Sequence, residues 1–303
     1  MREATTRALA TGQRGVALIA VLGFLAVMSL ITIGVVGAAR SVISSASRQL
    51  MRVQAQAAIE SGVEWAAYTL SEAHDTIPSI LAKPQALEIG GFHLKISARP
   101  ERAKVDLNFA DEPLLAAVFR YAGAESKKAE ELASAVEDWR DGDDLVHLNG
   151  AERMQYLGAG LHYGPANRLF QSVGELHLLL GLTPAVFACV RPELTILTQS
   201  PAIDLNAAEP GFLKLLNIGS SQHTAGGPSL ATGQLITPGD VYEIIVELED
   251  AKRQIRRAER VSVRVTGNPD DPFWILNIEA EFPIRDAAER ACPQAVDAAD
   301  GAR

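Results

Sequence analysis

Four carboxylates lie within seven residues near the middle of the chain, in the segment DWRDGDD at 138–144. Carboxylates held this close repel one another unless water or a hard cation screens them. Ca²⁺ is such a cation, since it takes about six to eight oxygen ligands from carboxylates and carbonyls. After a polar spacer, Asn149 and Glu152 add two more oxygen-bearing side chains. The segment is therefore a candidate for cation binding.

The spacing of these residues matches an EF-hand loop only in part. With Asp141 as position 1, Asp143 and Glu152 fall at positions 3 and 12, which carry calcium ligands in that loop. Leu145 and Val146 stand where the loop needs an oxygen ligand and a glycine. Spacing alone leaves two interpretations open: a metal site of another type, or a solvated acidic turn in which Asp138 or Asp141 caps a helix.

A long apolar segment near the N-terminus predicts a membrane helix. Residues 16–39 contain no charged side chain, and at about 1.5 Å per residue such a helix crosses a hydrocarbon core of about 30 Å. Gly15 precedes the segment and closes a short basic leader. An ordinary secretory signal is the alternative, because Gly-Ala-Ala at 37–39 offers a cleavage point. The segment is longer than the apolar region of about 7–15 residues that such signals carry.

The helical pattern continues past the membrane segment and is followed by strands. Apolar side chains recur at helical spacing up to about residue 71, so we expect one helix over residues 16–71 with an amphipathic second half. Gly-Gly at 90–91 predicts a hairpin within residues 86–98. The fold class is therefore α+β, with a long N-terminal helix packed on an antiparallel sheet. Its late strands are expected at 241–248, 256–265 and 274–282, as a meander.

The sequence between the hairpin and the late strands has a different character. It predicts helices at 112–122, 126–139, 172–180 and 184–190. VDLNFA at 105–110 and IDLNAA at 203–208 form a short internal repeat, each an extended segment followed by an Asn helix cap. A helical domain is therefore inserted into the sequence of the sheet. The predicted division is a leader at 1–15, a transmembrane helix at 16–39, the helix stalk and first strands at 40–105, the inserted helical domain at 106–232, the C-terminal strands at 233–283 and a disordered tail at 284–303.

Charge disfavours nucleic acid as a partner. The chain has a net charge of −9, and the segment 106–200 carries fourteen acidic against seven basic residues. Phosphate binding needs clustered Lys and Arg, so this charge argues against the helix-hairpin-helix type of DNA binding that the Leu-Asn segments suggest. The two cysteines, Cys189 and Cys292, have no metal-ligand spacing, and the sequence leaves open whether they pair.

The sequence also lacks the usual signals of catalysis. His147 and His162 lie near the acidic segment, as they would in a hydrolase. No nucleophile elbow, His-rich metal motif or phosphate-binding loop accompanies them. We therefore expect a structural protein and not an enzyme.

The motifs occur in an order that resembles one family. They are the junction at Gly15, Leu-Asn at 107–108 and 205–206, DWRDGD at 138–143, NGAE at 149–152, FQSVGEL at 170–176, GLTP at 181–184 and RPELT at 191–195. In this combination they closely resemble the K-type minor pseudopilins of type II secretion systems, over nearly all of residues 10–283. The resemblance implies a pilin-like body with an inserted all-helical domain, of the SAM-like or helix-hairpin-helix-like kind.

The resemblance also implies a place in the cell and a set of partners. It implies cleavage between Gly15 and Val16 by prepilin peptidase, methylation, a single-pass inner-membrane anchor with a cytoplasmic N-terminus, and a periplasmic body. It implies a position at the pseudopilus tip, with the minor pseudopilins I and J and other pseudopilins as partners, in the export of folded periplasmic proteins. A minor pilin of a type IV pilus or of a competence machine is the alternative.

Calcium binding in the acidic segment is a further implication of the resemblance. The prolines usual between the acidic cluster and NGAE are replaced here by Val146 and Leu148. The acid that often follows the glutamate is Arg153. Because of both departures, a complete set of calcium ligands is less expected in this chain. The positions that match the family's calcium-binding region are Asp138, Asp141, Asp143, Asp144 and Glu152.

Ala20 bears on the expected position of the subunit. Most pilin-like helices carry a glutamate five residues after the cleavage site, where this chain has Ala20. A buried carboxylate is costly without a partner charge, and in assembled pilins that partner is thought to be the N-terminal amine of a neighbouring subunit. A subunit with nothing above it has no such amine, so a tip position tolerates an apolar residue here.

Overall fold

The structure is a computed structural model that describes residues 13–73, 78–205, 207–208, 236–250 and 255–280. The contacts divide the chain into two units, Met1–Ala57 and Ala58–Arg303, and each is described by itself. The predicted leader, except for its last three residues, and the predicted disordered tail at 284–303 lie outside the described residues.

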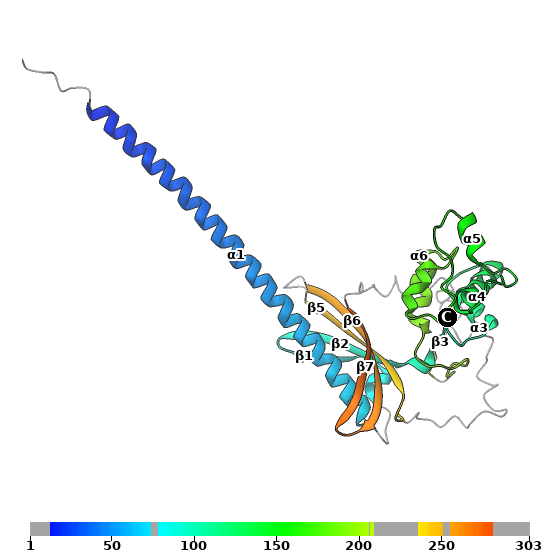
Figure 1. The fold of residues 1–303 in the computed structure, drawn as a ribbon. Coiled ribbons are helices and arrows are strands. Elements are labelled where there is room, and N and C mark those ends of the chain that lie inside the picture. Colours follow the sequence, from blue (N-terminus) through cyan, green and yellow to red (C-terminus); the bar gives the residue numbers. More distant parts are fainter. Residues whose placement is uncertain (1–12, 74–77, 206, 209–235, 251–254, 281–303) are drawn as a thin grey trace, which may run out of the picture. The chain divides into compact units, whose positions relative to one another are not determined.

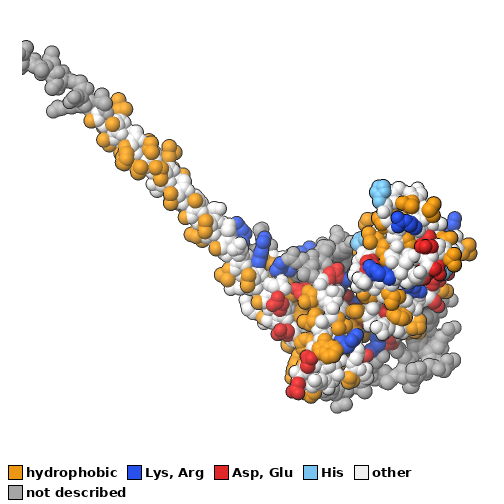
Figure 2. Space-filling view, viewed as in Figure 1, with side chains coloured by type: hydrophobic (Ala, Val, Ile, Leu, Met, Phe, Trp, Pro, Cys, Tyr) orange, Lys and Arg blue, Asp and Glu red, His pale blue; other side chains and the backbone are white. Residues whose placement is uncertain are grey.

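The first element is α1, Gln13–Ser71, a continuous helix of 59 residues (Figure 1). The predicted helix over residues 16–71 is confirmed, and it begins three residues earlier than expected. Large apolar side chains between Leu18 and Val36 surround it and are exposed (Figure 2). With a mean hydropathy of 2.7 in its most apolar window, the helix is long and apolar enough to cross a membrane. Because water disfavours such a surface, α1 fits a single membrane anchor.

The second unit contains a five-stranded antiparallel sheet with the strand order β1-β2-β5-β6-β7. The predicted hairpin and meander are therefore confirmed. Gly90 and Gly91 have φ values of +60° and +75°, which the hairpin turn between the first two strands requires. The strands are β1 (Gln85–Ile89), β2 (Phe92–Pro100), β5 (Val241–Asp250), β6 (Ile255–Asn268) and β7 (Asp271–Ala280).

The end of α1 that belongs to the second unit packs on one face of this sheet. In β2 and β5 buried apolar residues alternate with more exposed ones, as expected for strands that cover a helix on one side only. Gly62 marks the closest approach, because a Cβ built there would lie 3.1–3.3 Å from side-chain atoms of Leu94, Ile96 and Val246. The predicted α+β class, a long helix on an antiparallel sheet, is confirmed.

Between β2 and β5 the chain forms a helical insertion with its own apolar core, which includes Leu115, Phe119, Trp139 and Tyr156. The predicted helices at 112–122, 126–139 and 184–190 are confirmed. The segment at 172–180 forms a short 3₁₀ helix, and the helix at 153–158 was not predicted. The elements are η1 (Glu101–Ala103), β3 (Val105–Asp106), α3 (Glu112–Tyr121), α4 (Ser126–Arg140), α5 (Arg153–Gly158), η2 (Val173–Leu178), α6 (Pro184–Val190), η3 (Arg191–Glu193) and β4 (Leu194–Thr195), and α2 (Ser79–Ala82) precedes β1.

The predicted helix cap at Asn108 is wrong. Asp111 caps α3, and its Oδ1 accepts the Leu114 N–H at 3.1 Å. Asn108 instead makes two hydrogen bonds to the backbone of Phe170, donating Nδ2 to its carbonyl at 3.0 Å and accepting its N–H at 2.7 Å. It therefore joins two segments of the insertion far apart in sequence. Asn206, the other predicted cap, lies outside the described residues.

Candidate metal centre

The last turn of α4 places Asp138 in the core of the insertion. Its side chain is fully buried beside Trp139. The Arg140 guanidinium fixes the end of the helix, because it donates to the carbonyls of Leu107 and Ala110 at 2.7 and 2.8 Å. A carboxylate is rarely buried so completely without a counter-charge or a metal ion, so the surroundings of Asp138 decide what this region does.

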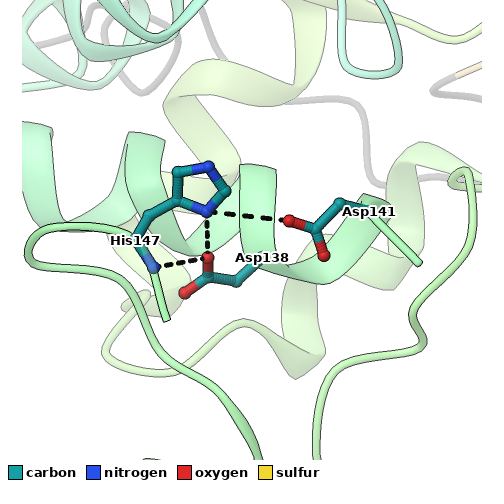
Figure 3. Close-up of side chains that lie close together, drawn as sticks. All are labelled: Asp138, Asp141 and His147. Atoms are coloured by element: carbon teal, nitrogen blue, oxygen red, sulfur yellow. Dashed lines mark hydrogen bonds and ion pairs between the residues drawn. The ribbon is translucent and has the colours of Figure 1, made fainter. Parts of the chain in front are cut away.

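His147 contacts one oxygen of Asp138 and lies close to Asp141 (Figure 3). Its Nδ1 is 2.5 Å from Asp138 Oδ1 and 3.6 Å from Asp141 Oδ2. The backbone N–H of His147 also donates to Asp138 Oδ1, at 3.0 Å. These three side chains form the compact group with metal-ligand chemistry found among the described residues. His147 is therefore bound to Asp138 through Oδ1, while the other oxygen of that carboxylate faces elsewhere.

Five buried oxygens around this group accept no hydrogen bond from the described part of the chain. All five are acceptors without a donor, so they cannot satisfy one another. A buried polar group without a partner costs about 1–3 kcal/mol, and native structures contain few. A cation held between Asp138 and Asp141, whose ligand atoms lie within 4.8 Å of one another, would supply a partner to their oxygens. The five atoms are Asp138 Oδ2, Asp141 Oδ1, Glu152 Oε1 and Oε2, and Asn167 Oδ1.

Gly150 leaves room for the free oxygen of Asp138. A Cβ built on Gly150 would lie 2.1 Å from Asp138 Oδ2, which is far inside van der Waals contact. The Gly150 N–H donates to the His147 carbonyl at 2.8 Å and closes the turn that brings both residues to Asp138. A side chain at position 150 would fill the space next to Oδ2.

The surroundings of the Asp141 and Glu152 carboxyl groups disfavour their ionised forms. Burial raises the pKa of the Asp141 carboxyl, and the carboxylates of Asp143 and Asp138 raise it further. Burial likewise raises the pKa of Glu152, with Asp138 and Asp141 adding to the effect. The hydrogen bond to Asp138 raises the pKa of His147. The site therefore carries excess negative charge, and a bound proton or metal ion would reduce the repulsion between its carboxylates.

Asp143 and Asp144 are placed differently from the other predicted ligands. Both are exposed. Asp143 Oδ1 accepts the Leu145 N–H at 2.8 Å, and Asp144 Oδ1 accepts a hydrogen bond from Asn167 Nδ2 at 3.1 Å. These two residues shape the loop, whereas Asp138, Asp141 and Glu152 carry the unpaired buried oxygens.

The donor set fits a hard divalent cation. Every free donor atom is an oxygen, from carboxylates and one amide, and Ca²⁺ prefers such ligands. The imidazole of His147 is directed at Asp138 Oδ1, an oxygen outside the free set. Among the residues that the structure describes, the free oxygens suit a hard cation such as Ca²⁺, and the His147 imidazole belongs to the same group.

The helical insertion matches a known protein family. Residues 98–199 fit the family model described as "Type II secretion system (T2SS), protein K". The chain is a relative of type II secretion system protein K. The predicted resemblance is thereby confirmed, and the segment that matches contains the candidate metal centre.

Sequence relatives from several bacteria carry the same name. Type II secretion system protein K of Dickeya chrysanthemi is 32% identical over 110 residues, 35% of this chain and 30% of that protein. The Klebsiella pneumoniae protein is 33% identical over 95 residues, 31% of this chain and 29% of that protein. The Pseudomonas aeruginosa protein is 28% identical over 224 residues, 65% of this chain and 66% of that protein. The chain thus aligns with about 30% of the length of the first two relatives and about two thirds of the last.

A solved structure shares the fold. The crystal structure of the GspK–GspI–GspJ complex from enterotoxigenic Escherichia coli contains a chain that is similar with a TM-score of 0.59 at 15% identity. The similarity covers 79% of this chain and 99% of that one. The similarity supports the α+β fold described for this chain.

Sequence reasoning missed two residues of the site. His147 was noted only as a candidate for catalysis, although its position in the turn between Asp138 and Gly150 brings it back to α4. Asn167 was not singled out, because it comes 15 residues after Glu152 with no recognisable spacing. Both residues reach the site only because the loops fold around the end of α4. The spacing of residues in the sequence does not show this folding.

The predicted processing site and the pairing of the two cysteines are described only in part by the structure. Gly15 and Val16, the predicted processing site, fall within the first turns of α1, where side chains are not described. Cys189 at the end of α6 is disulfide-bonded. The other cysteine of the chain, Cys292, lies outside the described residues.

Proposed function

We propose that this chain is a minor pseudopilin at the tip of a type II secretion pseudopilus, where it helps to initiate or cap assembly for the export of folded periplasmic proteins. The observation that carries this proposal is the match of residues 98–199 to protein K, together with one helix that is apolar enough to anchor the chain. Its relatives are named as secretion-system components, which supports a structural role and not an enzymatic one.

The apolar part of α1 gives the chain its place in the cell. Prepilin peptidase removes the leader between Gly15 and Val16, and the new N-terminus is methylated. Residues 16–39 span the inner membrane with the N-terminus in the cytoplasm, and the second unit lies in the periplasm. Exposed apolar side chains along this part of the helix support the anchor, and they supply the surface that packs against other pseudopilin helices in a filament.

The minor pseudopilins I and J are the proposed partners. The similar solved chain comes from a complex of GspK with GspI and GspJ, which supports partners of these two types. Ala20 supports a tip position, because an apolar residue there needs no neighbouring amine above it.

A deletion experiment tests the assembly role. Removal of the gene is expected to abolish export of secreted enzymes into the medium while twitching motility persists. The tagged full-length chain, expressed from a plasmid, is expected to restore export and to co-purify with the I and J pseudopilins from detergent-solubilised membranes. Normal export together with lost twitching would instead support the type IV pilus alternative.

Calcium is the proposed resident ion of the metal centre, held by residues among the predicted set Asp138, Asp141, Asp143, Asp144 and Glu152. The ion supplies positive charge to buried carboxylates. Asp138 and Glu152 are almost fully buried and have free oxygens, so they contribute directly. Asp143 and Asp144 hold the loop through their hydrogen bonds. Calorimetric titration of the full-length protein with CaCl₂ tests this, and absence of binding would remove the metal from the proposal.

A further inference from the structure

Cys189 lies in the last turn of α6, and its partly buried side chain packs against the core of the insertion. It is disulfide-bonded, and the part of the chain that the structure describes holds no free cysteine. The chain has one other cysteine, Cys292, which lies outside the described residues. A partner for Cys189 within the same chain can therefore only be Cys292.

The two cysteines belong to different parts of the second unit. Cys189 belongs to the helical insertion, whereas Cys292 follows β7, the last strand of the sheet, which ends at Ala280. About 12 residues lead from Ala280 to Cys292, and such a segment spans at most about 40 Å. A bond between the two cysteines thus adds a covalent link between the end of the sheet and the insertion.

The contact that already joins α6 to β7 is of a kind that stabilises little. Arg191, two residues after Cys189, forms an ion pair with Glu279 near the end of β7. The Glu279 side chain is 38% exposed, and exposed ion pairs contribute little to stability. A cavity of about 540 Å³ lies beside this pair, lined by Phe187 and Arg191 from the insertion and by Ile278 and Glu279 from β7. Side-chain packing therefore leaves this part of the boundary open.

We propose that Cys189 and Cys292 form a disulfide that fastens the segment after β7 to α6 and so clamps the insertion to the sheet. The inference rests on the proposed function, because disulfides form and persist in an oxidising compartment such as the periplasm. The two thiols lose two protons and two electrons as the Sγ–Sγ bond forms. The disulfide of a periplasmic thiol oxidase takes them up and becomes a dithiol.

Peptide mapping of the full-length protein from membranes tests the pairing. Free thiols are blocked with N-ethylmaleimide, and the protein is digested with trypsin without reduction. Because Arg191 precedes Pro192 and is not cut, Cys189 stays in the peptide 169–214, and Cys292 lies in the peptide 291–303. We expect these two peptides to be joined until reduction, in a protein that runs as a monomer on a non-reducing gel. Blocked thiols at both cysteines, or a disulfide-linked dimer, would overturn the inference.

Thermal unfolding in detergent micelles tests the clamp. Dithiothreitol is expected to lower the melting temperature of the parent by about 5 °C or more, because the bond closes a loop of about 100 residues. Cys189→Ser and Cys292→Ser should each melt with the reduced parent and not respond to dithiothreitol, since either change removes the same bond. Ala188→Ser is the matched control in the same turn of α6, and it should keep the response of the parent. A parent whose melting temperature is unchanged by reduction would overturn the clamp.

Failure of this inference is distinguishable from failure of the proposed function. Lost export in the deletion strain, with two free thiols in the purified protein, would keep the proposed function and overturn the disulfide. Normal export in that strain, with the two peptides still joined, would support the disulfide and remove the proposed function.

Discussion

The two oxygens of the Asp138 carboxylate have different surroundings. Oδ1 accepts the backbone N–H of His147 and contacts its imidazole, whereas Oδ2 lies next to Gly150 without a hydrogen bond among the described residues. His147 is thus a positioning residue, since it orients the carboxylate through one oxygen and leaves the other free. Ligands held in this way need little reorganisation when an ion binds.

Glu152→Gln is expected to have opposite effects with and without calcium. In EGTA at pH 7 the neutral amide removes a buried charge and offers donors to unpaired oxygens, so the melting temperature should rise by about 2–4 °C, equivalent to about 1 kcal/mol. In excess calcium the variant should melt below the parent, because a ligand that stabilises only the folded state is bound less tightly. Melting curves in both buffers measure this, and a variant that is destabilised equally in both would contradict it.

The same groups set the sign of the pH dependence. A carboxyl whose pKa is raised in the folded state destabilises that state above the folded pKa and is relieved as pH falls through it. His147, whose pKa is also raised, stabilises the fold below about 6.5 and loses this effect as pH rises through its folded pKa. Both effects make the calcium-free protein less stable from about pH 4.5 to above 6.5. Calcium and Glu152→Gln should each flatten this slope.

Gly150→Ala is expected to damage the metal centre. The new methyl group would lie 2.1 Å from Asp138 Oδ2, so the carboxylate or the turn must move, at a cost of about 1–3 kcal/mol. Gly142→Ala is the matched control, because nothing lies within 4 Å of a Cβ built there. The shift in melting temperature on adding CaCl₂ should shrink in Gly150→Ala and persist in Gly142→Ala. Equal shifts in the two variants would contradict the described role of Gly150.

The chemistry of the site was predictable only in part. Four carboxylates in seven residues suggested a cation but left a solvated acidic turn open, and only the family resemblance placed Asp138 among the ligands. Burial separates Asp138 and Asp141 from Asp143, which sits in the same short segment but faces solvent. Asp138 is buried in the last turn of α4, Asp141 is half-buried at the C-cap of that helix, and Asp143 is exposed beyond it. The role of Asn167 depends on tertiary contacts and has no sequence pattern.

Elements with a regular period were easier to predict from sequence. The second half of the long helix and the strands repeat their apolar residues at intervals of about 3.6 or 2, and this period indicates which face is buried. Short elements lack this information, and so α5 and the pairing of the extended segment at 105–106 with β4 were missed. The cap at Asn108 was misplaced because Asp111, three residues later, is an equally suitable capping residue and lies next to the first helical turn.

Gly62 sets the distance between α1 and the sheet, and Gly62→Val is expected to destabilise the second unit. A Cβ at this position would already be within 3.1–3.3 Å of Leu94, Ile96 and Val246, so the branched side chain forces the helix away at a cost of about 1–3 kcal/mol. Ser61→Val is the control, since Ser61 is on the exposed face of the same turn. Thermal unfolding in detergent micelles measures the difference, and equal melting temperatures would show that the packing tolerates the change.

Within the second unit, an ionic network links the insertion to the sheet. The Lys104 ammonium lies 3.2 Å from Glu101 and 2.9 Å from Glu243, and Arg260 lies 2.8 Å from Glu243. Burial alone would raise the pKa of Glu243, but Lys104 and Arg260 hold it below its ordinary value. A buried, paired network of this kind is costly to break by removing one partner. The network therefore favours one arrangement of the insertion on the sheet.

Gly15→Leu tests whether the apolar helix is retained and used for assembly. A peptidase pocket that accepts a residue without a side chain cannot take leucine, so the variant should keep its leader and migrate more slowly on a gel than the mature parent. Export of secreted enzymes should fall to the level of the deletion strain, because an unprocessed subunit stays in the membrane. Gly23→Leu is the control for processing alone, since the residue lies in the same apolar segment but outside the cleavage site. N-terminal sequencing of the mature parent should begin at Val16. A start at Arg40 would mean that the helix is discarded as an ordinary signal, and the proposed membership in a pseudopilus would then fail.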